Sequence, residues 1–421
     1  MSYIQKSYDI LSEVYLKDAY LNVCLAKNLG DKDKEKDKVV KIVYGVLENN
    51  VKYDYDLKAL TKSLPKNSVR VLLKIGMYCL DYMDSLPDYA VINNCVEYAK
   101  TLKKQAVSGF VNAVLKKYAI KNYDVKKVLL TKEDELSYKY NKPLWLVEKY
   151  VKEYPNDYKL KLDTKKALNE HIRVNTNKMT LTDLKYALRE RNTEFLETQK
   201  GGMFVKYNDF VKYLFNEGYV TIQSLSSMLV VYGMGLKKTD NVLDVCGAPG
   251  GKSMLISEIT KGNVICLDVH PHRVKLIESY KKRMGARVKT GVWDATKLYE
   301  AYVDKFDAVL CDAPCSGLGV TGKNPDILLR RKPEDIIEMA KVQKQILEVS
   351  KNYVKVGGVL MYSTCTNVLE ENSMVVEDFL SKNENFKPER IPLDYVNNGT
   401  IQLNEQKGLD GFFMARLVRK W

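Results

Sequence analysis

One stretch decides the fold of this 421-residue chain: Val242-Leu243-Asp244-Val245-Cys246-Gly247-Ala248-Pro249-Gly250-Gly251-Lys252-Ser253. It begins with a short apolar run typical of a buried strand and continues through a turn of small residues to a point where a helix can start. Small residues let the backbone approach a ligand closely at a helix N-terminus, where amide groups point outward. The stretch therefore predicts a strand, a ligand-binding turn and a helix.

Strands and helices alternate from about residue 221 to the end of the chain. Apolar runs predict strands over residues 241–245, 263–268, 287–290, 306–310 and 359–362, and residues 410–417 predict a last strand in an antiparallel hairpin. This alternation is typical of a doubly wound α/β domain. In such a domain ligands bind beyond the carboxyl ends of the parallel strands.

Acidic residues stand at the ends of successive predicted strands. Asp268 lies 22 positions after Cys246, where a carboxylate suits the two hydroxyls of a ribose. Asp294, after the third strand, could accept from an adenine amino group, and Asp312 follows the fourth strand. Dinucleotides and S-adenosylmethionine both bind turns of this kind. The Walker pattern and the G-x-G-x-x-G fingerprint are absent, which argues against a nucleotide hydrolase and against a dehydrogenase.

Two cysteine motifs also follow predicted strands: Asp312-Ala313-Pro314-Cys315 and Ser363-Thr364-Cys365-Thr366. Two thiols and a carboxylate at neighbouring strand ends can face one pocket, and this set suits nucleophilic attack on an electron-poor ring. A cysteine at a strand end is often only a core residue, but the two motifs together favour catalysis. No zinc site is expected, because no Cys-x-x-Cys pair is present.

The first 130 residues predict helix after helix, and one string among them is fairly specific: Gly109-Phe110-Val111-Asn112-Ala113-Val114-Leu115. This region resembles the all-helical NusB-like RNA-binding domain. The alternative is a helical bundle that only supports the catalytic domain. Residues 131–220 mix helix and strand and resemble the small α+β subdomain that precedes the catalytic domain in RNA cytosine methyltransferases.

The motifs at 246–252, 312–317 and 363–366 resemble those of the RNA (cytosine-5) methyltransferase family, in particular its bacterial members that act on 16S ribosomal RNA. The resemblance implies three parts: a NusB-like bundle (1–130), a small connecting α+β subdomain (131–220) and a Rossmann-like methyltransferase domain (221–421). It also implies that residues 246–252, Asp268, Asp294 and Asp312 line a pocket for S-adenosylmethionine.

By the same resemblance, Cys365 adds to carbon 6 of a cytosine and Asp312 holds ring N3. Cys315 then helps to remove the proton from carbon 5, although water or another base remains an alternative for this step. The target base must leave any stack to reach Cys365, so a cytidine in single-stranded or loop RNA is expected.

The composition agrees with an RNA partner. Lys and Arg total 67 against 53 for Asp and Glu, a net charge of +14 that favours polyanions. Lys323, Arg330 and Arg331 are a candidate phosphate-contacting patch or a solvated helix face. The eight cysteines have no framework spacing, and neither a signal segment nor a membrane-spanning run is evident. We therefore expect a monomer in the cytoplasm, without membrane association.

Two alternatives remain open at this stage. The substrate could be transfer RNA instead of 16S ribosomal RNA, or the protein could be an RNA-binding assembly factor without turnover. The intact set of Cys365, Cys315 and Asp312 argues against the second alternative, because a binding module has no need for it.

Overall fold

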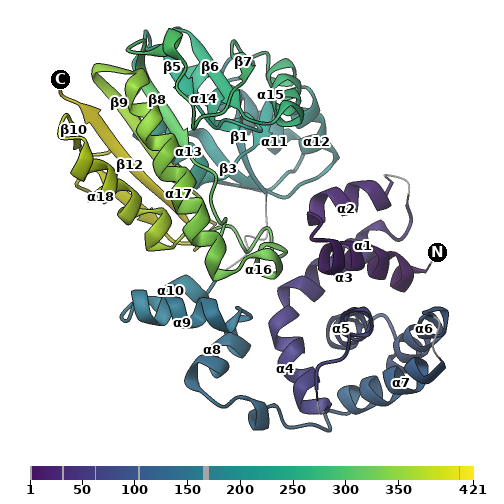
Figure 1. The fold of residues 1–421 in the computed structure, drawn as a ribbon. Coiled ribbons are helices and arrows are strands. Elements are labelled where there is room, and N and C mark those ends of the chain that lie inside the picture. Colours follow the sequence, from purple (N-terminus) through teal and green to yellow (C-terminus); the bar gives the residue numbers. More distant parts are fainter. Residues whose placement is uncertain (1, 31–32, 62, 103–104, 165–169, 407) are drawn as a thin grey trace. The chain divides into compact units, whose positions relative to one another are not determined.

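The computed structural model describes residues 2–30, 33–61, 63–102, 105–164, 170–406 and 408–421. The chain forms two compact units, Met1–Thr164 with Thr321–Arg331, and Lys165–Val320 with Lys332–Trp421 (Figure 1). The division into three parts at residues 130 and 220 stays a prediction.

The first unit opens with a helical bundle. Its helices are α1 (Tyr3–Lys17), α2 (Leu21–Asn28), α3 (Lys36–Glu48), α4 (Asn50–Leu60), α5 (Asn67–Tyr82), α6 (Asp88–Thr101) and α7 (Gln105–Ala119). Their apolar faces form one core, in which α5 is central because it packs against α1, α3, α6 and α7. This confirms the predicted all-helical N-terminal region.

The bundle differs from the predicted pattern in one place. An amphipathic pattern of apolar residues continues from Ile4 to Leu25, but α1 ends at Lys17 and α2 starts at Leu21. Asp18 adopts a left-handed backbone conformation with φ 50°, which terminates α1. An aspartate tolerates this conformation better than most residues, because its short side chain hydrogen-bonds locally.

The rest of the first unit is also helical. Its elements are η1 (Val125–Val128), α8 (Lys132–Tyr140), α9 (Leu144–Glu153), α10 (Tyr158–Leu162) and α16 (Ile327–Arg330). The phenolic hydroxyls of Tyr55 and Tyr138 tie α4 to α8 by donating to Asp134 (2.6 Å) and Asp56 (3.1 Å). None of the helices in the described parts of the chain combines the length and apolar character needed to cross a membrane.

A small antiparallel sheet begins the second unit, with strand order β2-β3-β1-β4. Its elements are β1 (Glu170–Val174), α11 (Leu181–Glu190), β2 (Phe195–Glu197), η2 (Gln199–Gly201), β3 (Gly202–Val205), α12 (Asp209–Asn216) and β4 (Val220–Ile222). Gly201, with φ +75°, makes the turn of the β2–β3 hairpin possible.

The second sheet has eight strands in the order β10-β12-β9-β8-β5-β6-β7, with β11 paired to β12. The strands are β5 (Val242–Asp244), β6 (Val264–Asp268), β7 (Lys289–Val292), β8 (Phe306–Asp312), β9 (Val354–Thr364), β10 (Phe386–Pro388), β11 (Thr400–Leu403) and β12 (Phe412–Arg419). Strands β5 to β9 pair in parallel, whereas β10 to β12 pair antiparallel.

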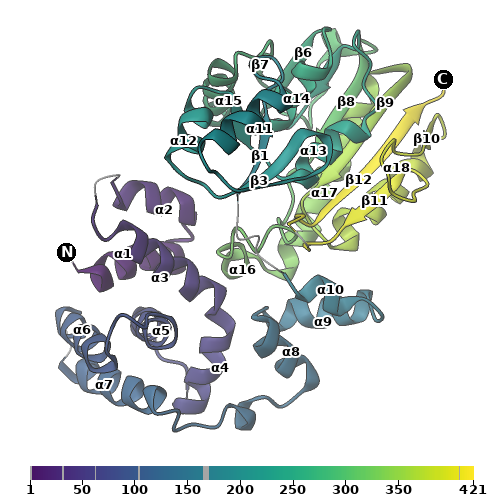
Figure 2. The ribbon, with the colours of Figure 1, turned by 180° about the vertical axis from the view of Figure 1, so that it is seen from behind.

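Helices cover both faces of this sheet. They are α13 (Leu225–Gly233), α14 (Gly251–Ile259), α15 (Pro271–Met284), α17 (Pro333–Ser350) and α18 (Ser373–Lys382), joined by η3 (Glu300–Tyr302), η4 (Lys351–Tyr353) and η5 (Leu369–Glu371). One core holds α13, α14 and α15, and the other holds α17 and α18. Figure 1 shows α17 in front of the sheet, and Figure 2, seen from the opposite side, shows α13 in front of it.

The strand order confirms the predicted α/β methyltransferase-like fold. The order reverses between β5 and β8, so the ends of these two strands, at Asp244 and Asp312, mark the point where ligands bind in such sheets. The predicted terminal antiparallel hairpin is formed by β11 and β12, and β12 also lies between β9 and β10 in the sheet. Strand β7 begins at Lys289, two residues later than predicted.

Candidate active site

The turn from β5 to α14 forms the floor of the site. Gly250 precedes α14 with φ +114°, a backbone conformation that residues with a side chain rarely adopt. A Cβ atom at Gly247 would lie 2.2 Å from Sγ of Cys266, so the turn packs directly on β6. The predicted need for small residues therefore has a steric cause in this structure.

A cavity of about 440 Å³ lies over this turn and the ends of β5, β6 and β8. Seven of the predicted site residues line it: Cys246, Ala248, Asp268, Asp294, Asp312, Cys315 and Cys365. Its apolar lining comes from Val245, Val269, Trp293, Ala295, Pro314, Val342 and Ile346. The other predicted residues, Gly247, Pro249, Gly250, Gly251 and Lys252, belong to the turn and to the start of α14 without lining the cavity.

Asp268 and Asp294 are held in place by their neighbours. Asp268 is buried at 2% exposure, accepts from the His270 backbone amide (3.1 Å) and pairs with Arg273 (3.0 Å). Arg273 also donates to the Ala248 carbonyl (3.0 Å), which ties the end of β6 to the turn. Asp294 accepts from the hydroxyl of Thr296 (2.6 Å), and this hydrogen bond lowers the pKa of Asp294.

The two predicted catalytic thiols meet in the cavity. Cys315 follows β8 and Cys365 follows β9, and their Sγ atoms are 3.2 Å apart. Both residues are half-buried. The hydrogen bond to Cys365 and burial raise the pKa of the Cys315 thiol well above its ordinary value. Cys315 is therefore a protonated thiol at neutral pH in this arrangement.

Asp312 has a cationic partner that sequence reasoning did not identify. Its carboxylate accepts from Nζ of Lys252 (2.6 Å) and from the Ser363 hydroxyl (2.7 Å). Burial alone would lower the pKa of Lys252, but the Asp312 charge outweighs it and leaves this pKa above its usual value. Lys252 also lies 5.1 Å from the centre of the Phe412 ring. Asp312, in the wall of the cavity beside the two thiols, is thus one half of an ion pair.

Two protein-family models match separate regions of the chain. A model described as the 16S rRNA methyltransferase RsmB/F family matches residues 231–418, and a NusB family model matches residues 5–119. The chain is 33% identical to the probable ribosomal RNA small subunit methyltransferase B of Bacillus subtilis, over 98% of each chain.

The chain belongs to the 16S rRNA methyltransferase RsmB/F family. A second relative in this family, the ribosomal RNA small subunit methyltransferase B of Escherichia fergusonii, is 28% identical over 92% of this chain and 91% of that protein. The predicted methyltransferase class and the NusB-like N-terminal region are confirmed.

Solved structures have the same fold. The crystal structure of PH0851 superposes with a TM-score of 0.82 at 25% identity and covers 99% of both chains. The structure of NSun6 from Pyrococcus horikoshii with SFG has a TM-score of 0.55 at 23% identity and covers 69% of this chain and 98% of that one.

Arg330, a candidate for a phosphate-contacting patch or a solvated helix face, has partners within the protein. It pairs with Asp326 at 3.2 Å, and its guanidinium lies 3.8 Å from the centre of the Tyr20 ring. Its side chain is only 14% exposed. Through these contacts Arg330 links α16 to the start of α2. The spacing of residues in the sequence could not indicate this link.

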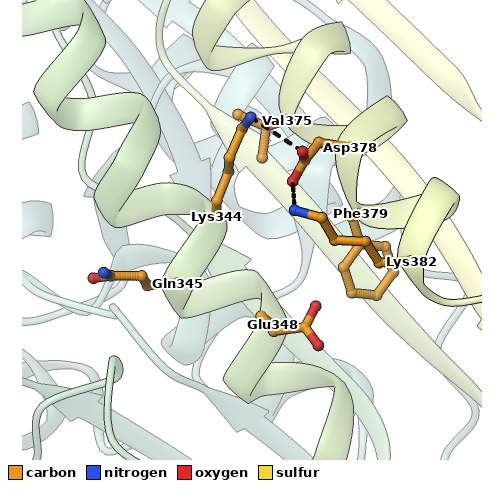
Figure 3. Close-up of a pocket in the computed structure, with 7 residues that line it drawn as sticks. All are labelled: Lys344, Gln345, Glu348, Val375, Asp378, Phe379 and Lys382. Carbon is orange, nitrogen blue, oxygen red and sulfur yellow. Dashed lines mark hydrogen bonds and ion pairs between the residues drawn. The ribbon is translucent and has the colours of Figure 1, made fainter.

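A second pocket, of about 220 Å³, lies between α17 and α18 and contains none of the predicted residues. Lys344 and Lys382 both reach Asp378 there, at 3.4 and 2.8 Å (Figure 3). Its polar lining is therefore already paired within the protein, and its size is half that of the cavity at the thiols.

Proposed function

We propose that this protein transfers a methyl group from S-adenosylmethionine to carbon 5 of a cytidine in 16S ribosomal RNA. The observation that carries the proposal is the pair of thiols at 3.2 Å, Cys315 and Cys365, beside the Asp312 carboxylate in one cavity. Addition to a pyrimidine ring needs one nucleophile, one group at the ring nitrogen and one base for the leaving proton. Each of these groups has a candidate here.

The cavity fits the cofactor by its chemistry. Asp268 and Asp294 offer carboxylates for hydroxyl and amino groups, and Trp293 offers an aromatic wall. When bound, S-adenosylmethionine supplies an electrophilic methyl group. We propose that residues 246–252, Asp268, Asp294 and Asp312 form its site, with Lys252 acting through its ion pair with Asp312.

The protein's own residues then perform the steps on the base. The Cys365 thiolate forms a bond to carbon 6, and the electron pair of the ring double bond makes carbon 5 nucleophilic. Asp312 shares a proton with N3, and the positive charge of Lys252 beside it offsets the negative charge that develops there. Once Cys365 is bonded to carbon 6, its charge no longer holds the proton on Cys315, and that proton passes to solvent. After carbon 5 carries the methyl group, the Cys315 thiolate takes the carbon-5 proton, the ring double bond re-forms, and the bond to Cys365 breaks.

The choice of RNA rests on similarity and charge. The curated relatives are named as small-subunit ribosomal RNA methyltransferases, and the chain carries a net charge of +14. A base that reaches Cys365 has to leave its stack, which favours a single-stranded or loop cytidine. We propose 16S ribosomal RNA as the partner and transfer RNA as the alternative.

To test this proposal, the protein is incubated with S-adenosylmethionine that carries a labelled methyl group and with either unmodified 16S ribosomal RNA or transfer RNA. Wild-type protein should transfer label to 16S ribosomal RNA, and digestion should release it as 5-methylcytidine. The C365A variant should transfer none. Preferential labelling of transfer RNA would overturn the substrate, and undiminished transfer by C365A would overturn the mechanism. Binding of 16S ribosomal RNA without any transfer would favour an assembly factor.

A further inference from the structure

Two neighbouring residues contact both cysteine loops. Glu371 ends η5, and Asn372 directly follows it; their exposures are 0% and 2%. The Tyr362 hydroxyl donates to the Glu371 carbonyl (2.6 Å), which anchors this segment to β9. Neither residue lines the cavity, so neither is in a position to touch the substrate.

Glu371 holds the loop of Cys315. Its Oε2 atom accepts from the backbone amide of Ser316 (2.8 Å) and from Nε2 of Gln343 (2.8 Å). The same Gln343 nitrogen donates to the carbonyl of Pro314 (2.9 Å). The residues on both sides of Cys315 are therefore fixed by one buried carboxylate and its amide partner on α17.

Asn372 holds the loop of Cys365 in the same way. Its Oδ1 accepts from the Thr364 hydroxyl (2.5 Å), and its Nδ2 donates to the carbonyl of Thr366 (3.0 Å). Nδ2 also donates to Gln402 of β11 (2.9 Å). The residues on both sides of Cys365 are thus fixed by one buried amide.

We propose that Glu371 and Asn372 are positioning residues that set the thiols against the substrate, Glu371 acting through Cys315 and Asn372 through Cys365. Burying a carboxylate is unfavourable unless hydrogen bonds compensate for its lost hydration. Here one such bond comes from the Ser316 amide in the Cys315 loop and another from Gln343, which itself donates to Pro314 in that loop. The two loops are held from adjacent positions of the backbone. A displacement of about 1 Å at a reacting group can reduce a rate about 100-fold.

This inference rests on the proposed two-thiol function, and it predicts opposite effects for neighbouring substitutions. In E371A, Cys315 is displaced while Cys365 still adds, so the covalent protein–RNA adduct should accumulate as elimination slows. In N372A, Cys365 itself is displaced, so adduct formation should fall at least about tenfold. Both variants should release less methylated RNA than wild type, E371A because the methylated adduct persists and N372A because little adduct forms.

The experiment mixes each full-length variant with S-adenosylmethionine and unmodified 16S ribosomal RNA and measures adduct on a denaturing gel and methyl transfer in parallel. Wild type and C365A are included, and E377A is the matched control because Glu377 is exposed on the following helix, α18. The control should behave as wild type. Q343L, which removes only the amide partner, should accumulate adduct in the same direction as E371A.

The outcomes separate the two proposals. Adduct accumulation by E371A and Q343L, with adduct loss by N372A, supports the positioning roles. Equal loss of transfer by all three, without accumulation, overturns them and assigns a merely structural role. If E371A does not fold by thermal melting, the Q343L adduct level decides. Absence of transfer and adduct in wild type would instead overturn the proposed function.

Discussion

At the scale of single residues, the Asp312 carboxylate depends on Lys252 Nζ, 2.6 Å away in a partly buried position. Removing one partner of such a pair leaves a charge without its counter-charge. The sequence showed both residues, but it could not show that the lysine of the glycine-rich turn points to a strand end 60 positions later.

We expect K252M to lower methyl transfer at least about tenfold, because the charge at N3 loses support. Its free energy of unfolding should fall by about 1–3 kcal/mol, as for a buried acceptor that loses a donor. The control is K344M, whose partner Asp378 lies in an exposed pair (Figure 3). The K344M change should be below about 1 kcal/mol in urea denaturation. Equal activity of K252M and wild type would contradict the assignment.

Asp244 gives a prediction for pH. Burial raises its pKa to about 7, against a hydrogen bond from Ser253 that lowers it. An aspartate in the unfolded chain has a pKa of about 3.9. Between about pH 4 and pH 7 the folded state therefore keeps a proton on Asp244 that the unfolded state loses. The contribution of protonated Asp244 to the free energy of unfolding is full below about pH 4 and is lost as pH rises through about 7.

In D244N the side chain stays neutral at every pH. Urea denaturation of wild type and D244N at pH 5 and pH 8 should therefore show that the stability of D244N relative to wild type increases toward pH 8. Other titrating groups are common to both proteins and cancel in the difference. A difference that does not change with pH, or one that decreases, would contradict a buried neutral Asp244.

At the scale of elements, close backbone contact joins the two cysteine loops to β12. The Gly411 amide donates to the Gly319 carbonyl (2.6 Å), and the Gly319 amide donates to the Cys365 carbonyl (3.0 Å). A Cβ atom at Gly319 would lie 2.1 Å from the Gly411 carbonyl oxygen, and backbone cannot move aside as a flexible side chain can.

We expect G319A to lose methyl transfer and to unfold at lower denaturant, because the loop that follows Cys315 and the start of β12 must separate. The matched substitution is G109A, because Gly109 is an exposed residue of α7 and a Cβ there would meet nothing within 4 Å. That variant should be more stable than wild type by about 0.5–1 kcal/mol. Wild-type activity and stability in G319A would show that this contact is not a constraint.

Much of the fold was predictable because local pattern and structure agree. The strand, glycine turn and helix from Val242 to Ser253 lie where the pattern places them, and β8 and β9 bring Cys315 and Cys365 together as strand ends do. The pattern predicted helices throughout the first 130 residues but not the break at Asp18 between α1 and α2. The break depends on one residue in a left-handed conformation, which apolar periodicity does not register.

The supporting part of the site was not predictable for a different reason. Glu371 and Gln343 come from η5 and α17, and only the three-dimensional fold brings them to Pro314 and Ser316. A buried carboxylate has no signature in sequence that distinguishes it from an exposed one. The pair Glu370-Glu371 resembles any solvated turn until burial is known.

At the scale of the whole molecule, the net charge of +14 makes RNA affinity depend on salt. Each phosphate that a lysine or arginine neutralises releases a counterion, so log affinity falls linearly with log salt concentration. We expect a slope of several units for 16S ribosomal RNA between about 50 and 200 mM salt, measured by fluorescence titration. An affinity that does not change with salt would contradict binding through the basic surface.

The central claim is that Cys365 becomes covalently attached to the target cytosine. The most direct measurement incubates the protein with S-adenosylmethionine and 16S ribosomal RNA transcribed with 5-fluorocytidine, in which carbon 5 carries no proton for Cys315 to remove. The account predicts a stable adduct whose peptide, by mass spectrometry after nuclease and protease digestion, contains Cys365. Attachment at Cys315, or no adduct while unmodified RNA is methylated, would contradict it.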